Sequence, residues 1–557
     1  MIAKPVERTG AQILVDALRI HGVERAFGVP GESYLAVLDA LYDAQNAIRF
    51  FSCRQEGGAA NMAEAVGKLT GRPGICFVTR GPGASNASIG VHTAFQDSTP
   101  MILFVGQVAR QVQEREAFQE IDYRRMFGEM TKWTAEINDP ARIPEMVSHA
   151  FHLAVSGRPG PVVLALPEDV TEERCTVADT APYRVVQAHP GEADLAELRA
   201  LLAAARRPLM MVGGGGWTAD ACADILAFAE ANNLPTATTL RCQDLFDNLH
   251  RNYVGVVGIA TSPALAERVR KADLLLVVGP RLGQMTTGDY SLVEPPTPRQ
   301  RLVHVHAGAE ELGRVYQGDL LINAGMPQFA AAVRGLAPVD GTAWAEWAEA
   351  ARADYLDHLR PTPGPGALDM GEVMAVLRER LPEDAIVTNG AGNYTIWAHR
   401  FYRFRRFRTQ LAPTSGAMGY GVPAGIAAKA VHPDRTVVTF AGDGCFLMTG
   451  QELATAVQYG LDPLILVVNN GMYGTIRMHQ ERRHPGRVIG TDLTNPDFAA
   501  YARAFGAFGE TVERTEEFAP ALDRALAAGR AAVLDLRVDP EAITPTTTLS
   551  GLRGTPG

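Results

Sequence analysis

The chain has few of the features that mark secreted, membrane-spanning or disulfide-rich proteins. Six cysteines occur in 557 residues and no two form a CxxC pair, so neither a disulfide scaffold nor a cysteine-based metal site is expected. No apolar run approaches the roughly 20 residues that span a bilayer. The first residues, MIAKPVERTGAQ, also lack the apolar core of a signal peptide. We therefore expect a cytoplasmic protein without a membrane partner.

Positive charge is also scarce. Lysine and arginine total 52, against 62 aspartates and glutamates, for a net charge of −10. No dense basic run combines with interleaved aromatic residues in the way that nucleic-acid binders require. The most basic stretch, residues 400–408, fits a solvated connecting segment or a subunit contact better than an RNA patch. We expect no nucleic-acid partner.

Three segments of the chain alternate short β-branched runs with amphipathic stretches. This pattern predicts parallel sheets covered by helices, and the chain length predicts several cores. The predicted class is α/β, with three doubly wound parallel-sheet domains over residues 1–180, 190–336 and 365–557. The main predicted strands are ERAFGVPG, ICFVTRG, MILFVGQV, PVVLALP, LMMVGGGG, DLLLVVGPRL, RLVHVHAG, AIVTNGAG, TVVTFAGDG, LILVVNN and AVLDLRV.

Two strand ends in the third segment, TFAGDGCF and LVVNNGMY, give the strongest functional signal. In parallel α/β sheets ligands bind beyond the carboxyl ends of the strands, so Asp443 and Asn470 are expected at a ligand site. A carboxylate and an amide oxygen suit Mg²⁺ that also carries diphosphate oxygens. The neighbouring Gly442 and Gly444 allow close approach of backbone to phosphate. For GDG alone a structural turn is the alternative, and the joint pattern favours the cofactor.

A GDG followed by a paired asparagine resembles the thiamine-diphosphate motif, and the resemblance extends over nearly the whole chain. It implies a pyrimidine-binding domain, a central Rossmann-like domain and a diphosphate-binding domain. By that resemblance Asp443, Asn470 and the backbone carbonyl of Met472 would hold Mg²⁺. The other cofactor-binding residues it implies are Gly392, Asn393, Tyr394, Gly416, Met418, Gly442, Gly444, Cys445 and Tyr473.

Two catalytic residues follow from the same resemblance. The segment RQEGGAANMA matches a family segment whose glutamate hydrogen-bonds the aminopyrimidine ring, so Glu56 would drive deprotonation of the thiazolium to the ylid. The alternative for Glu56 is an acid favoured by the helix dipole. Met418 would hold the two cofactor rings in a bent shape, and a core methionine is the alternative.

Several segments most resemble acetolactate synthases, among them GPGASN, DSTPMILFVGQV and AFQE. By this match Phe118 and the catalytic Gln119 would line the substrate channel, with Gly31 and Ile476 beside them; a partly buried loop is the alternative for AFQE. The chain departs from these enzymes at Glu32, where decarboxylases have an aspartate in GVPGD. Glu32 is thus either a proton-transferring acid or a solvent-facing residue at a helix start.

Another departure is His479, which stands where acetolactate synthases carry a tryptophan that sets acceptor preference. The histidine predicts a more polar pocket. The central segment contains VGGGGW, but Thr218 stands where a dinucleotide fingerprint needs its third glycine. His306 and Gly308 replace acidic residues of the FAD-binding acetolactate synthases. FAD stays an open alternative that these residues disfavour, and a nicotinamide cofactor is disfavoured too.

The expected function is thiamine-dependent decarboxylation of a small-molecule 2-oxo acid, with carboligation of the product to a carbonyl acceptor. The open alternative is a decarboxylase that releases an aldehyde; Glu32 favours it, and AFQE favours ligation. In the resembling family the glutamate comes from one subunit and the metal site from another. A homodimer is therefore the expected minimum, and a homotetramer is the alternative.

Overall fold

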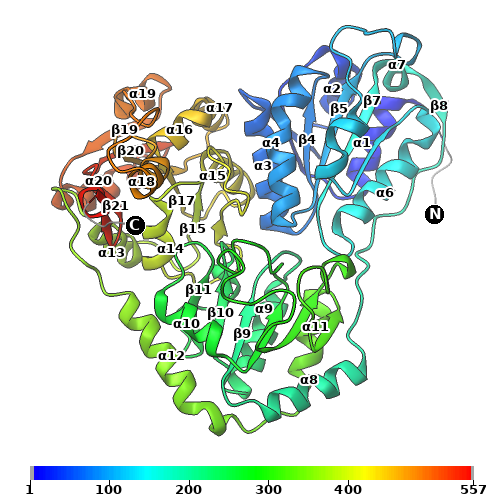
Figure 1. Ribbon diagram of the computed structural model, residues 1–557. Helices are drawn as coiled ribbons and strands as arrows, with labels where there is room; N and C mark the ends of the chain where they lie inside the picture. The colour runs from blue at the N-terminus through cyan, green and yellow to red at the C-terminus, as the bar shows by residue number, and fades with distance from the viewer. Residues whose placement is uncertain (1–5, 554–557) are drawn as a thin grey trace.

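The computed structural model describes residues 6–553 and contains three six-stranded sheets, all parallel and flanked by helices (Figure 1). The predicted α/β class with three doubly wound domains is confirmed. Among the described residues, no helix combines the length and apolar character that crossing a membrane requires.

The N-terminal sheet has the strand order β3-β2-β4-β5-β7-β6. Its strands β4, β5 and β7 are buried along their whole length, which explains their unbroken apolar sequences. The strands are β2 (Arg25–Gly28), β3 (Arg49–Ser52), β4 (Gly74–Val78), β5 (Met101–Gln107), β6 (Trp133–Glu136) and β7 (Pro161–Pro167). The helices are α1 (Gly10–Ile20), α2 (Leu35–Asp43), α3 (Glu56–Thr70), α4 (Pro82–Asp97), α5 (Tyr123–Phe127), α6 (Ile143–Val155) and α7 (Glu168–Glu172). A short antiparallel pair joins β1 (Glu7–Thr9) to β8 (Arg174–Thr176).

The central sheet has the order β11-β10-β9-β12-β13-β14, which is 3-2-1-4-5-6 when its strands are counted along the chain. That order is the one found in dinucleotide-binding folds. Its strands are β9 (Pro208–Val212), β10 (Thr236–Thr239), β11 (Tyr253–Val257), β12 (Leu274–Val278), β13 (Arg301–His306) and β14 (Leu320–Asn323). The helices are α8 (Glu192–Ala204), α9 (Ala219–Ala231), α10 (Pro263–Lys271), α11 (Met326–Arg334) and α12 (Ala345–His358). Helix α12 packs Ala348 and Tyr355 into the core of this domain.

The C-terminal sheet has the order β16-β15-β17-β18-β20-β19. Counted along the chain this is 2-1-3-4-6-5, the same order as in the N-terminal sheet. Its strands are β15 (Ile386–Asn389), β16 (Gln410–Leu411), β17 (Val437–Gly442), β18 (Leu464–Asn469), β19 (Phe508–Val512) and β20 (Ala532–Arg537). The helices are α13 (Met370–Arg380), α14 (Thr395–Phe401), α15 (Gly421–Val431), α16 (Asp443–Thr449), α17 (Leu453–Gln458), α18 (Gly474–Arg483), α19 (Phe498–Ala504), α20 (Thr515–Ala527) and α21 (Leu549–Arg553). A hairpin of β21 (Ala542–Thr544) and β22 (Thr547–Thr548) precedes α21.

The N-terminal and C-terminal domains share one core. Helix α3 packs against α15, and Figure 1 shows these helices facing each other between the two sheets. A single buried apolar cluster runs from Phe27 and Phe51 in one domain to Tyr420 and Phe446 in the other. Since one core spans the border, the two sheets hold fixed positions relative to each other within one chain.

Candidate active site

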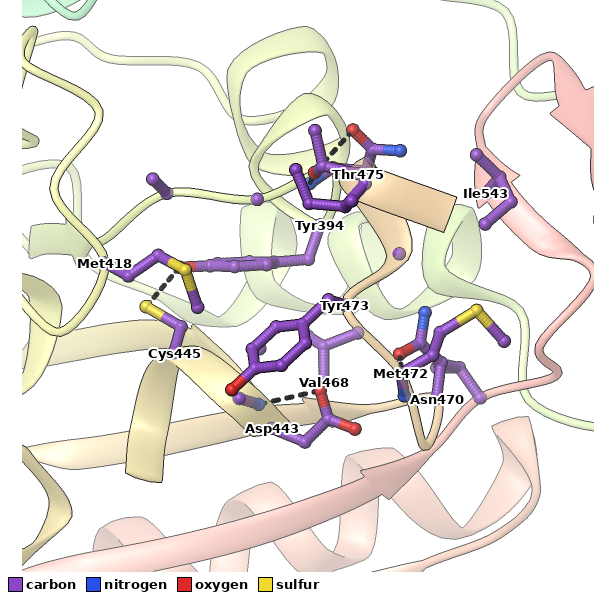
Figure 2. A pocket seen from close by; sticks show the side chains of 18 of the residues that line it. Tyr394, Met418, Asp443, Cys445, Val468, Asn470, Met472, Tyr473, Thr475 and Ile543 are labelled. Carbon is purple, nitrogen blue, oxygen red and sulfur yellow. Dashed lines mark hydrogen bonds between the residues drawn. The ribbon is translucent and has the colours of Figure 1, made fainter. Parts of the chain in front are cut away.

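A cavity of about 240 Å³ opens at the carboxyl ends of β15, β17 and β18. The strand order of this sheet reverses between β15 and β17, so the loops that follow these strands diverge and leave a crevice. Figure 2 shows side chains from these loops around the cavity. The sequence-predicted residues that line it are Gly392, Asn393, Tyr394, Gly416, Met418, Gly442, Asp443, Gly444, Cys445, Asn470, Met472, Tyr473 and Ile476.

Asp443 is the first residue of α16 and is only 2% exposed. Its carboxylate accepts hydrogen bonds from the backbone N–H of Gly444 at 2.9 Å and of Gly471 at 2.8 Å, and from Asn495 Nδ2 at 2.8 Å. Burial raises the pKa of Asp443, and the three hydrogen bonds act against that rise. No lysine, arginine or histidine forms an ion pair with it among residues 6–553. A buried carboxylate with neutral partners alone favours a bound cation.

Asn470 and Met472 lie beside this carboxylate in the loop after β18. The turn passes through Gly471, whose φ of +67° suits glycine. The Asn470 side-chain oxygen accepts from the Met472 N–H at 3.2 Å, and the Met472 carbonyl accepts from Gly474 at 2.9 Å. No group of three His, Cys, Asp or Glu side chains that could hold a metal ion occurs in the described part of the chain. One carboxylate with neutral amide and carbonyl oxygens suits Mg²⁺, which also keeps water and phosphate ligands.

Glycines leave room for two aromatic rings along the cavity. A Cβ atom on Gly444 would lie 2.5 Å from the Tyr473 ring, and one on Gly442 would lie 3.0 Å from the Tyr394 ring. Gly392 has a φ of +151°, and a Cβ there would lie 2.7 Å from the Tyr394 ring. A larger residue at these positions would displace the rings, so the glycines allow backbone and aromatic ring to meet in the cavity wall.

In Figure 2, Cys445 and Met418 lie beside Tyr394, on the side of the cavity away from Asn470 and Met472. The Cys445 sulfur accepts from the Tyr394 hydroxyl at 3.3 Å and from the Gly419 N–H at 3.1 Å. Met418 is partly buried and packs against the C-terminal core, while Gly416 has a φ of +72° and faces open space. Met418 is therefore held by packing but remains available to a ligand in the cavity.

The predicted N-terminal residues gather elsewhere, at the carboxyl ends of β2, β3 and β4. Glu56 begins α3 and accepts from Asn86 Nδ2 at 2.9 Å. A Cβ on Gly31 would lie 2.4 Å from the Thr79 side chain, and one on Gly81 would lie 2.8 Å from the Gln119 carbonyl. These contacts place Gly31, Glu56 and Gln119 at one edge of the N-terminal sheet.

The N-terminal group does not line the cavity of the same chain, whose lining residues all fall between Met370 and Ile543. Glu32 begins a short 3₁₀ helix and is exposed. Phe118 is 73% exposed, and its carbonyl accepts from Arg80 Nε at 3.1 Å. One chain thus presents two separated groups of predicted site residues.

Helix α18 carries the two remaining predicted residues. Ile476 lines the cavity and is 54% exposed. His479 lies one turn further along the helix, is exposed and does not line the cavity. Partial burial, with the nearby Arg482 and Arg483, lowers the pKa of His479. The structure therefore leaves His479 outside the cavity lining, one helical turn beyond Ile476.

Several residues of this site were not predicted from the sequence, and three of them contact predicted residues or close the cavity. Asn495 donates to Asp443, and the Thr475 hydroxyl donates to the Asn393 side chain at 2.9 Å. Ile543, from the C-terminal hairpin, closes one side of the cavity. Asn495 and Ile543 lie well beyond the NN motif in the sequence, so only the fold brings them to the site. For Thr475 the one signal in the sequence was its place beside Ile476, with a hydroxyl that can donate a hydrogen bond.

Comparison with known proteins agrees with this geometry. Family models of thiamine pyrophosphate enzymes match residues 8–126 as the N-terminal TPP binding domain, 195–333 as the central domain and 390–536 as the C-terminal TPP binding domain. The acetolactate synthase large subunit of Corynebacterium glutamicum is 33% identical over 94% of this chain and 85% of its own length. That of Parasynechococcus marenigrum is 34% identical over 96% and 88%. The acetolactate synthase isozyme 2 large subunit of Escherichia coli is 31% identical over 95% of both chains. The chain therefore belongs to the thiamine pyrophosphate enzyme family and is similar over nearly its whole length to acetolactate synthase large subunits.

Proposed function

We propose that the protein binds thiamine diphosphate and Mg²⁺ in the C-terminal cavity, decarboxylates a 2-oxo acid and joins the remaining acyl unit to a second carbonyl compound. The observation that carries this proposal is the buried Asp443 carboxylate, which has neutral partners and lies beside Asn470 where the strand order reverses. Such a site suits a cation and the phosphates that it accompanies.

The types of side chain and backbone group around the cavity suit the cofactor. Asp443, Asn470 and the Met472 carbonyl would hold Mg²⁺, and the glycine turns with Asn393 and Tyr394 would receive the diphosphate. Met418 and the Gly416 carbonyl would meet the two rings, and Cys445 and Tyr473 complete the walls. When bound, thiamine diphosphate supplies an electron sink that lowers the barrier to loss of carbon dioxide.

The protein's own contribution is proton transfer and orientation. Glu56 would exchange a proton with the aminopyrimidine nitrogen, which requires a carboxylate within hydrogen-bonding reach of that atom. Gly31, Glu32, Phe118 and Gln119 would form the substrate side of the site. Ile476 and His479 would then border the acceptor at the cavity mouth.

A homodimer is the smallest assembly that we propose, because Glu56 and the cavity lie apart in one chain. Both groups carry exposed apolar side chains, which are typical of association surfaces. Those near the N-terminal group are Leu35, Ile89 and Phe118, and those near the cavity are Leu447, Met448 and Ile476. A tetramer of two such dimers is equally compatible. Six cysteines without a disulfide support a reducing compartment such as the cytoplasm.

Carboligation is supported by the relatives, which are named acetolactate synthases. The test is to supply the protein with thiamine diphosphate, Mg²⁺, pyruvate and a panel of larger 2-oxo acids, and to identify the products by proton NMR. Acetolactate or another acyloin is expected. Free aldehyde alone would move the enzyme to the decarboxylases and make Glu32 the residue to mutate next, and no release of carbon dioxide from any acid would refute the proposal.

We further propose that the enzyme works without FAD. A second cavity of about 260 Å³ adjoins the glycine turn after β9 and is lined by Arg241, whose buried, unpartnered Nε and Nη1 would suit an anionic group of any kind. What disfavours FAD is the end of β13, where His306 and Gly308 stand in place of the acidic residues of the FAD-binding acetolactate synthases, and His306 Nδ1 lies 2.9 Å from the Gly308 carbonyl. The purified protein should lack the visible absorption bands of flavin, and a stoichiometric flavin spectrum would overturn this proposal.

A further inference from the structure

We infer that Glu452, on the C-terminal domain, is the positioning residue that fixes the backbone carrying Glu56, on the N-terminal domain. The inference rests on the proposed role of Glu56 and extends it to a residue outside the cavity. Glu452 ends a short 3₁₀ helix, Gly450–Glu452, that continues α16. It does not line the cavity, and its side chain is fully buried.

The Glu452 carboxylate reaches across the domain border to the start of α3. Its Oε1 accepts from the backbone N–H of Gln55 at 2.9 Å and of Arg54 at 3.1 Å, and its Oε2 lies 3.2 Å from the same Arg54 nitrogen. These two residues directly precede Glu56. A carboxylate of one domain thus satisfies the N–H groups at the helix start of the other, where the helix dipole favours negative charge.

The carboxylate itself is tightly held. The Thr455 hydroxyl donates to Oε2 at 2.6 Å, and a Cβ on Gly58 would lie 2.6 Å from Oε1. The glycine in the first turn of α3 therefore leaves the space that Glu452 occupies. Gln55 completes the cap, since its side chain accepts from the Gly58 N–H at 3.0 Å.

Two further hydrogen bonds join the same C-terminal segment to residues 52–54, just before α3. Arg54 Nη2 donates to the Gln458 side chain at 2.5 Å, and the Ser52 N–H donates to the Tyr459 hydroxyl at 2.7 Å. Of these three C-terminal side chains, Glu452 is the one that binds Gln55, the residue directly before Glu56. Without it, two partly buried N–H groups at the helix start would lose their acceptor, and the first turn of α3 would shift or fray.

Such a shift matters because proton transfer depends steeply on geometry. Glu452→Ala should slow exchange of the reactive carbon-bound proton of thiamine diphosphate with D₂O by about 10-fold to 100-fold, as expected when a catalytic group is misplaced by a mutation outside the site. The exchange is followed by NMR in the loaded enzyme. Cofactor affinity should change little, because Glu452 does not touch the cavity. Glu452→Gln should restore much of the rate, since its amide oxygen can still accept from Gln55.

The matched control is Glu64→Gln, which alters an equally buried carboxylate on α3 that accepts from Tyr420 of the C-terminal domain. Both variants should lower the melting temperature, but only the Glu452 variants should slow exchange. In the double variant Glu56→Gln/Glu452→Ala the exchange rate should equal that of Glu56→Gln alone, because the two residues act through one group.

Two results would overturn the inference. One is an unchanged exchange rate in folded, cofactor-loaded Glu452→Ala, and the other is a further loss in the double variant beyond that of Glu56→Gln. If Glu56→Gln itself exchanges as fast as wild type, the proposed role of Glu56 fails instead, so the two failures are distinguishable.

Discussion

Asp443 shows how one residue can define a site. It is buried, its pKa is raised by that burial, and only neutral groups contact it. An uncompensated charge in such a place costs stability unless a cation binds. The motif in the sequence predicted Asp443 and Asn470 because both follow a strand directly. It could not predict Asn495, whose contact with Asp443 depends on how a distant loop folds back.

The first prediction concerns Asp443→Asn. Thiamine diphosphate with Mg²⁺ should raise the melting temperature of the wild type, because a ligand that binds only the folded state stabilises it. The variant should keep its fold, since the amide oxygen can still accept from Gly471, but should lose this increase. Thermal scans with and without cofactor test this, with Asp523→Asn, at an exposed ion pair, as control. An unchanged cofactor-dependent increase in the variant would refute the assignment of Asp443.

The second prediction concerns Gly444→Ala. The new methyl group would lie 2.5 Å from the Tyr473 ring, which must then move into or away from the cavity. Cofactor affinity, measured by calorimetry, should fall about 5-fold to 150-fold, as expected from an overpacking cost of about 1–3 kcal/mol. Gly128→Ala is the control, because open space surrounds Gly128. Equal affinities in both variants would mean that the glycine turn does not shape the cofactor site.

At the scale of elements, the sequence predicted every interior strand except the threonine-rich β10 and missed most edge strands. Strands β4, β5, β12 and β18 are wholly buried and read as unbroken apolar runs. The missed strands include β6 (WTAE), β14 (LLIN) and β19 (FGETV), which lie at sheet edges. An edge strand is partly exposed and short, so its sequence lacks the apolar pattern that identifies a strand.

The third prediction concerns β13. Burial, and then the nearby His306, lower the pKa of His304 to about 4, although the Pro280 carbonyl opposes this. An unfolded histidine titrates near 6.5. As the pH falls through this interval the unfolded chain gains a proton that the folded chain does not, so stability is lost on acidification, by about 2 kcal/mol at pH 5.

His304→Gln should therefore show a smaller decrease in melting temperature between pH 7 and pH 5 than the wild type does. Its amide can still donate to the Pro280 carbonyl, so the test compares charge rather than hydrogen bonding. His484→Gln, at an exposed position, is the control. A parallel pH dependence in His304→Gln and wild type would show that His304 does not contribute.

At the scale of the whole molecule, the two cofactor-binding domains have the same strand order although the sequence shows no fixed-period repeat. Both place their site residues where that order reverses, Gly31 after β2 and Asp443 after β17. Sequence patterns predicted the two groups separately. Their separation within one chain depends on the packing of α3 against α15, which no local pattern encodes.

The central claim is that one active site combines Glu56 of one chain with the Asp443 cavity of another. Subunit mixing tests it most directly. Glu56→Gln and Asp443→Asn homodimers should each be inactive in carbon dioxide release from the best 2-oxo acid. After dissociation and random reassociation, half of the dimers would be mixed, and each mixed dimer would have one intact site, so about a quarter of the wild-type activity should return. If mass spectrometry confirms mixed dimers and no activity returns, the site is not shared between chains and the account is contradicted.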